Sequence, residues 1–205
     1  MKRTVLIFGI SLLIGIGISV LYIQVIALSD NKASYDGSRA PPNALQGSIT
    51  YIDGEVLWQS RTATEAAELG GSTPIQQGET IETGDDGEVT ILFDEDTLID
   101  IFSKSSVSFT QTLPANIVIT HRGGEVEYSQ ETATIPLSIR VGHLLVKLHE
   151  GAISIIFEES NVTVRVIEGS ATTVYNSLEY ETNYEELNKG ESFFYDDISR
   201  ESEVL

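Results

Sequence analysis

The stretch that decides the fold is Ile75–Phe109, which reads IQQGETIETGDDGEVTILFDEDTLIDIFSKSSVSF. Within it, Val89, Ile91 and Phe93 stand at every second position, which is the period of a strand with one buried face. Asp86-Gly87 comes just before this run, and such dipeptides form the tight turns that join neighbouring strands. The stretch therefore predicts short strands connected by turns.

The same two signals recur along most of the chain. Val162, Val164 and Val166 alternate with polar residues, as a half-buried strand requires. Turns are predicted at several further glycine pairs: Asp53-Gly54, Gly123-Gly124, Glu150-Gly151, Glu168-Gly169 and Lys189-Gly190. About a dozen strands without intervening helices predict an all-β domain, and a stacked β-roll similar to a double-stranded β-helix is the architecture we expect.

A hydrophobic segment precedes this domain. Val5–Leu28 contains no charged residue, and a helix of that length spans roughly 36 Å, enough to cross a bilayer core of about 30 Å. Lys2 and Arg3 precede it, so the positive-inside rule places the N-terminus in the cytoplasm. A cleaved signal peptide is the alternative, but the apolar run is long for one and its end is a poor cleavage site.

We therefore expect a single-pass protein of the cytoplasmic or inner membrane, with its C-terminal domain outside. Ser11, Gly15 and Ser19 recur at a spacing of four residues, so they could form a packing face for a second membrane helix. The alternative is that Gly and Ser are simply common in spanning helices. The expected parts are a cytoplasmic stub (1–4), a transmembrane helix (5–28), a flexible linker (29–46), a β domain (47–195) and an acidic tail (196–205).

The charge balance limits the possible partners. The chain has 12 Lys and Arg against 31 Asp and Glu, a net charge of −19. A surface this acidic repels phosphate backbones, so we do not expect the protein to bind nucleic acid. The lipid bilayer, through 5–28, and an unknown envelope protein or glycan remain as partners. The absence of cysteine excludes disulfides and thiolate metal sites.

The sequence contains no catalytic motif of a known kind, so no enzyme activity and no cofactor are expected. Two acidic turns flank residues 88–93, and their carboxylates are weak candidates for a calcium site: Asp85, Asp86, Asp94 and Asp96. Asp-Gly pairs are also ordinary turn formers, and we favour that explanation. Histidines on strands are more often surface or turn residues than ligands, and we expect this of His121, His143 and His149.

The residues around these turns resemble the FecR family domain, an extracytoplasmic domain of bacterial envelope regulators. The resemblance covers about 47–195 and is carried by Gly78, Thr83, Gly84, Gly87, Phe93 and Asp94. It implies a β-roll that takes part in envelope signalling. Glu95-Asp96-Thr97 departs from the family pattern, which has a glycine at this corner.

In the founding member of that family, a cytoplasmic segment handles a sigma factor. We expect the residues of this chain before the membrane segment, Met1–Thr4, to be too few for that contact. The leading functional hypothesis is therefore a non-enzymatic protein- or glycan-interaction module. The alternative is a signalling accessory that senses a partner and relays its state through the transmembrane helix. An envelope hydrolase is the third hypothesis.

Overall fold

The computed structural model describes residues 39–71, 73–132 and 134–205, and every regular element within them is a β-strand. The prediction of an all-β fold is confirmed for this part of the chain. The strands are β1 (Gly47–Asp53), β2 (Val56–Gln59), β3 (Ala67–Glu68), β4 (Thr80–Thr83), β5 (Glu88–Phe93), β6 (Thr97–Ile101), β7 (Ser106–Leu113), β8 (Asn116–Gln130), β9 (Leu137–Val141), β10 (Leu144–Glu158), β11 (Asn161–Asn176), β12 (Thr182–Asn188), β13 (Ser192–Asp196) and β14 (Ser202–Val204).

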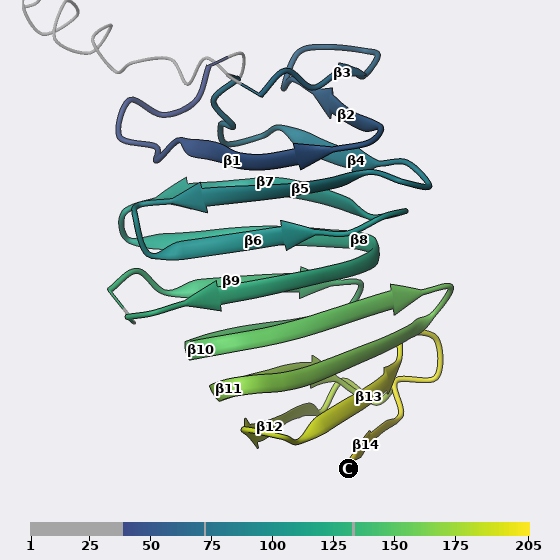
Figure 1. Cartoon of the computed structure of the whole chain (residues 1–205). Helices are drawn as coiled ribbons and strands as arrows, with labels where there is room; N and C mark the ends of the chain where they lie inside the picture. The colour runs from purple at the N-terminus through teal and green to yellow at the C-terminus, as the bar shows by residue number, and fades with distance from the viewer. Residues whose placement is uncertain (1–38, 72, 133) are drawn as a thin grey trace, which may run out of the picture. The chain divides into compact units, whose positions relative to one another are not determined.

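These strands stack into two layers, which are visible one behind the other in Figure 1. The front sheet contains β1, β5, β6, the second half of β8, the second half of β10, the first half of β11, β13 and β14. The back sheet contains β3, β2, β4, β7, the first half of β8, β9, the first half of β10, the second half of β11 and β12. Only β8 and β9 pair in parallel among the strand pairs of the described residues.

Three long strands, β8, β10 and β11, belong to both layers. Each bends at a glycine where the sequence predicts a turn: Gly124, Gly151 and Gly169 have positive φ. The turns that the sequence predicts at these three places as hairpins or corners are therefore corners, where the chain does not reverse. The chain bends from one layer into the other while β10 and β11 stay paired, Gly151 opposite Gly169, because a glycine accepts the left-handed backbone that a bend requires.

The glycine pair at the β10–β11 bend leaves no room for a side chain. A Cβ atom on Gly151 would lie 2.1 Å from the carbonyl oxygen of Glu168, and one on Gly169 would lie 1.9 Å from that of Glu150. These distances are far below van der Waals contact. Both positions therefore require glycine for their φ angle and for the close approach of the two backbones.

Other predicted turns are confirmed. Asp53-Gly54 separates β1 from β2, Asp86-Gly87 precedes β5, and Lys189-Gly190 lies between β12 and β13. At Gly142 the sequence favours a bulge or bend instead, because the apolar alternation of residues 137–141 changes its phase at Leu144. That expectation is corrected by the structure, in which Gly142-His143 forms a two-residue turn between β9 and β10, with Val141 opposite Leu144. The apolar phase changes there because the chain reverses its direction.

The hydrophobic core lies between the two layers. Alternate residues of almost every strand point into it, as in β5, where Val89, Ile91 and Phe93 are fully buried. Aromatic pairs connect the layers: the ring centroids of Phe93 in β5 and Phe109 in β7 lie 5.4 Å apart. Near the C-terminal end, Tyr175 contacts Phe193 and Tyr195 in the same way. Such aromatic contacts contribute more than their buried area alone.

The described residues before β1 and after β13 are hydrogen-bonded to the sheet. Leu45 donates its N–H to Thr112 O over 2.6 Å and accepts the hydroxyl of Thr112 at 2.8 Å, so the segment before β1 is already fixed there. The residues expected to form a separate acidic tail, 196–205, instead continue the fold, since β14 pairs with β13. The expected transmembrane segment 5–28, with Ser11, Gly15 and Ser19, lies outside the described residues. Within those residues, no helix has the length and hydropathy to cross a bilayer.

His121 is buried in the core, contrary to the surface or turn position expected from the sequence. Its Nε2 lies 3.2 Å from Gly123 O and 3.1 Å from Gly124 O. Because both partners are carbonyl acceptors, the neutral ring carries its proton on Nε2. Burial lowers the pKa of His121 from 6.5 to about 4, although the two carbonyl contacts act in the opposite direction. The histidine is a structural part of the β8 bend.

This buried histidine predicts acid sensitivity of the fold. Between pH 6.5 and about 4 the unfolded chain binds a proton that folded His121 does not, so stability falls as the pH decreases through that window. The expected loss from this group is up to about 3 kcal/mol. Urea unfolding at pH 7 and pH 4.5 should show a smaller acid-induced loss in His121→Leu than in the wild type. His143→Gln, which changes an exposed histidine, is the control. An equal loss of unfolding free energy between pH 7 and pH 4.5 in all three proteins would show that His121 is not the cause.

Candidate functional site

The outer face of the front sheet carries a row of polar side chains that is in register across neighbouring strands. Thr90 pairs with Asp100, Asp100 with Glu127, Glu127 with Ser154, and Ser154 with Arg165. These residues alternate with buried ones on the same strands, so their side chains point away from the core. The strand period of two therefore places two carboxylates side by side on the surface.

Glu125 adds a third carboxylate to this row. It lies two residues before Glu127 on β8 and accepts a hydrogen bond from the Ser154 hydroxyl at 3.3 Å. Asp100 Oδ1 accepts a short hydrogen bond of 2.6 Å from the Thr90 hydroxyl. We call Asp100, Glu125 and Glu127 the acidic face.

The members of the acidic face repel one another. The pKa of Glu127 is raised, first by desolvation and then by the charges of Asp100 and Glu125. Like charges directly opposite each other on neighbouring strands are destabilising. A sheet that keeps such a pair loses stability at neutral pH, and a cationic group bound over it would recover that loss.

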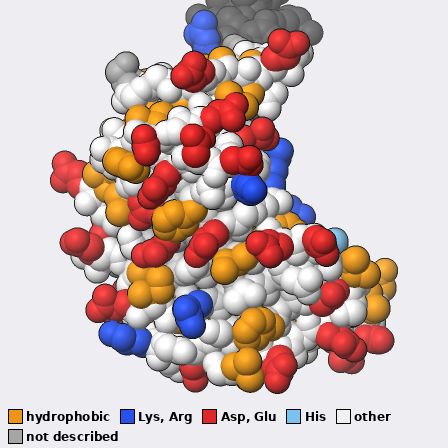
Figure 2. Space-filling model, turned by 45° about the vertical axis from the view of Figure 1, so that its right-hand side comes forward, with side chains coloured by type: hydrophobic (Ala, Val, Ile, Leu, Met, Phe, Trp, Pro, Cys, Tyr) orange, Lys and Arg blue, Asp and Glu red, His pale blue; other side chains and the backbone are white. Residues whose placement is uncertain are grey.

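Apolar side chains lie between the carboxylates on the same outer face. Leu92 pairs with Leu98 in the row beside Asp100, and Ile156 pairs with Glu125. All three apolar side chains are half-buried, and Phe194 farther along the sheet is 39% exposed. Figure 2 shows carboxylates spread among apolar side chains on the face that it presents. A face that mixes exposed apolar area with one sign of charge is typical of a protein-binding surface.

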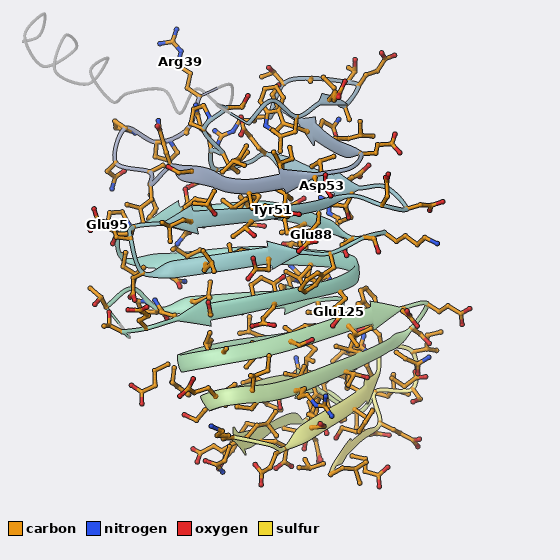
Figure 3. All side chains as sticks on the ribbon, in the orientation of Figure 1. Arg39, Tyr51, Asp53, Glu88, Glu95 and Glu125 are labelled. Atoms are coloured by element: carbon orange, nitrogen blue, oxygen red, sulfur yellow. The ribbon has the colours of Figure 1, made fainter. Side chains whose placement is uncertain are left out.

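Further carboxylates extend this surface toward one end of the strands. Asp53 of β1 pairs with Glu88 of β5. In Figure 3 their side chains and that of Glu125 of β8 lie at the same end of the sheet, whereas Glu95 lies at the opposite end of β5. Three carboxylates, Asp53, Glu88 and Glu125, thus lie at this end of the front sheet.

The acidic turns singled out in the sequence lie at opposite ends of β5 and do not converge. Asp85 forms an ion pair with Lys104 at 3.5 Å, and Asp86 accepts the Glu55 N–H at 3.3 Å. Asp96 accepts both the N–H and the hydroxyl of Thr132. Asp94 lies in the turn itself with a φ of 51°. Among the described residues, no three His, Cys, Asp or Glu side chains are arranged to hold a metal ion.

The residues that carry the family resemblance act as structural ties in this fold. The Thr83 hydroxyl donates to Phe102 O at 2.5 Å and accepts the Ser105 N–H at 2.9 Å. Gly84 donates to Glu55 O, and Gly78 donates to Phe109 O. Gly87 stands directly before β5, and Phe93 is buried. These contacts fix strand corners, and Ser105 also connects Thr83 to the backbone of Glu125 in the acidic face.

The sequence analysis did not identify the acidic face. Alternation within each strand could have shown that Asp100, Glu125 and Glu127 point outward. Their proximity depends on the pairing of β6 with β8, which brings residues 27 positions apart into register, as for Asp100 and Glu127. Strand pairing over that distance leaves no local signal in the sequence.

With this geometry known, the chain can be compared with other proteins. No family model matches it, and no curated protein matches its sequence. Two crystal structures of a candidate anti-sigma factor from Parabacteroides distasonis resemble it, each with a TM-score of 0.53 and with sequence identities of 13% and 12%. The similar region covers 62% of this chain and 58% of that protein. At this identity the likeness shows the fold alone, and the resemblance to the FecR family domain stays a prediction.

The repulsion within the acidic face can be measured through stability. A raised pKa means that the folded chain binds a proton at Glu127 more readily than the unfolded chain, so stability falls as the pH rises through that pKa. Glu127→Gln should therefore raise the unfolding free energy at pH 7, by no more than about 1 kcal/mol because solvent screens the site. The gain should vanish below pH 4. Glu185→Gln on β12 is the matched control, and a gain that does not depend on pH would show that the carboxylate charge is not its cause.

The β5–β6 turn provides a second test. Asp94 and Glu95 have φ angles of 51° and 58°, in the left-handed region that costs non-glycine residues about 1 kcal/mol or more. Glu95→Gly should consequently stabilise the domain by about 1 kcal/mol in urea unfolding. Glu158→Gly, at a position without positive φ, should give no gain. Equal effects of the two substitutions would show that the turn is not strained.

Proposed function

We propose that this protein is a non-enzymatic regulator of the cell envelope, and that its β domain binds a protein partner through the acidic face. The observation that carries the proposal is the outer face of the front sheet. There, Asp100, Glu125 and Glu127 form a charged cluster beside half-buried Leu92, Leu98 and Ile156. The partner would present basic and apolar side chains, because complementary charge steers association and apolar contacts stabilise the complex.

The regulatory part of the proposal is supported by the fold. The chain shares its architecture with a protein described as a candidate anti-sigma factor. We therefore prefer a signalling role to that of a passive interaction module. The architecture that we propose is the stacked β-roll. The proposal includes the predicted transmembrane helix at 5–28, an N-terminus in the cytoplasm and a β domain outside it.

The aromatic side chain best suited to stack on a sugar ring is partly buried in this structure. Trp58, the single tryptophan of the chain, packs partly buried against the core. Its indole N–H donates to Glu79 Oε2 at 3.0 Å. A ring held in this way does not offer a free face to a sugar.

The partner interface can be tested by charge reversal on the full chain in its native membrane. An Asp100→Lys/Glu127→Lys double variant should reduce in-cell crosslinking to the wild-type partner at least about tenfold, because close charge pairs at interfaces are worth more than 1.4 kcal/mol. Wild-type capture should weaken as the salt concentration rises. Glu185→Lys/Glu186→Lys, with the same charge change on β12, is the control. Equal capture by the two variants would refute the proposed interface.

The relay through the membrane is separated from binding by a second set of variants. Ser11→Leu/Gly15→Leu/Ser19→Leu should abolish the transcriptional or transport response to the partner while capture by the β domain persists. Gly17→Leu, two positions away on the expected helix, is the control. If both the response and the association remain unchanged, the signalling role is wrong and a passive module remains.

A further inference from the structure

A cationic cavity lies apart from the acidic face, where the β9–β10 turn, the end of β11 and the β13–β14 loop meet. It has a volume of about 350 Å³ and is lined by Arg140, His143, Leu144, Leu145, Asn176 and Arg200. No carboxylate is among these lining residues, in a chain with 12 Lys and Arg against 31 Asp and Glu. A cavity of this size holds a small ligand, and the composition of its wall favours an anion.

Asp197 fixes two of the lining residues, His143 and Arg200, through hydrogen bonds. Its Oδ1 accepts the backbone N–H of His143 at 2.7 Å and contacts the ring Nδ1 at 3.0 Å. Its backbone carbonyl accepts Arg200 Nε at 3.0 Å, and its N–H donates to Ser160 O at 2.8 Å. One residue thus connects two turns and the β13–β14 loop. Its carboxylate is bonded to His143 and is not part of the lining, in which the charged side chains are those of the two arginines.

The backbone at this site has a positive φ at two residues, of which Gly142 adopts it without strain. Arg200 has a φ of 59° and Gly142 a φ of 55°. An arginine in the left-handed region persists only where its surroundings determine it, and such residues concentrate at ligand-binding sites. Arg200 is also fixed by a hydrogen bond of 3.3 Å from its Nη1 to Asn176 O. Its guanidinium is therefore oriented before a ligand arrives.

Arg140 retains most of its hydrogen-bonding capacity. In the part of the chain that the structure describes, its guanidinium makes one long contact, from Nε to Gly142 O at 3.4 Å. The Nη donors of Arg140 can therefore turn to a ligand that lies beside the fixed guanidinium of Arg200. Two guanidinium groups that share a cavity match the planar, bidentate geometry of a carboxylate or phosphate.

The other wall of the cavity is apolar and continues onto the back sheet. Leu144 is buried and Leu145 half-buried. Leu145 pairs with Val174, which pairs with Tyr184, a side chain that is 70% exposed. A ligand whose oxyanion contacts the two arginines would rest its remaining atoms on this row. An apolar group next to the anion is therefore accommodated, and a bare ion leaves the row uncovered.

From this geometry we infer that the cavity binds a carboxylate carried next to a short apolar group, with Arg140 and Arg200 on the carboxylate and Leu145 against the apolar part. The site is independent of the acidic face, which lies on the outer side of the front sheet. A free amphipathic acid and the C-terminal residue of a peptide offer the same chemistry, and the experiment distinguishes them.

Calorimetric titration of the full chain with N-acetyl-leucine tests the inference. We expect saturable binding that N-acetyl-leucinamide, its neutral analogue, does not show. Arg140→Gln and Arg200→Gln should each weaken binding about tenfold or more, since a charge-assisted hydrogen bond is lost. Arg165→Gln, which removes the same charge from the front sheet, should leave the affinity unchanged. If Arg200→Gln unfolds, Arg140→Gln alone still tests the inference. Its substitution should not unfold the domain, because Arg140 is exposed and makes one long hydrogen bond.

Three results would overturn the inference: no heat of binding, equal binding of the neutral analogue, or equal binding by inorganic phosphate, which has no apolar group. An acetylated tripeptide that ends in leucine identifies the source. If it binds more tightly than N-acetyl-leucine, the ligand is a peptide terminus, and equal or weaker binding assigns a free acid. The Asp100→Lys/Glu127→Lys variant should bind N-acetyl-leucine normally, so this site can fail or succeed independently of the partner interface.

Discussion

The structure depends on one constraint, that β8, β10 and β11 pass from one layer to the other while β10 and β11 stay paired with each other. At the β10–β11 bend the two backbones approach so closely that neither Gly151 nor Gly169 can carry a Cβ atom. This close approach lets the pairing continue through the bend, so that both layers form one hydrogen-bonded sheet. The core, the in-register rows on the front sheet and the turns around Asp197 all follow from the positions that these three strands impose.

Much of the fold could be predicted from the sequence because its signals are local. Val89, Ile91 and Phe93 fix their own strand by alternation, and Asp86-Gly87 marks its start. At the three bends the sequence could not distinguish a hairpin from a corner, because a glycine with positive φ serves in either, and the two differ only in what lies opposite. His121 was misplaced because its two carbonyl partners exist only once β8 has bent. The acidic face and the cationic cavity both depend on strand pairing between residues far apart in the sequence.

The two surfaces divide the charge of the domain. The front sheet gathers Asp100, Glu125 and Glu127 on its outer face, whereas two of the few arginines line a cavity bounded by β9, β10 and β11. Each surface is built from residues of several strands. A fold of this kind suits a protein that binds, because its strands provide rigid positions and its chemistry lies in the side chains of its outer faces.

The shared strands also determine how the domain responds to mechanical load. Most strands lie across the stack, with β1 at one end of the front sheet and β14 at the other (Figure 1). A force that separates these two ends acts along the interstrand hydrogen bonds, which are perpendicular to the strands, and peels the outer strands away one bond at a time. The peeling stops at β8, β10 and β11, because each is paired in both layers and its bonds must break in the two layers together. These strands would form a mechanically resistant centre flanked by end segments that yield at lower force.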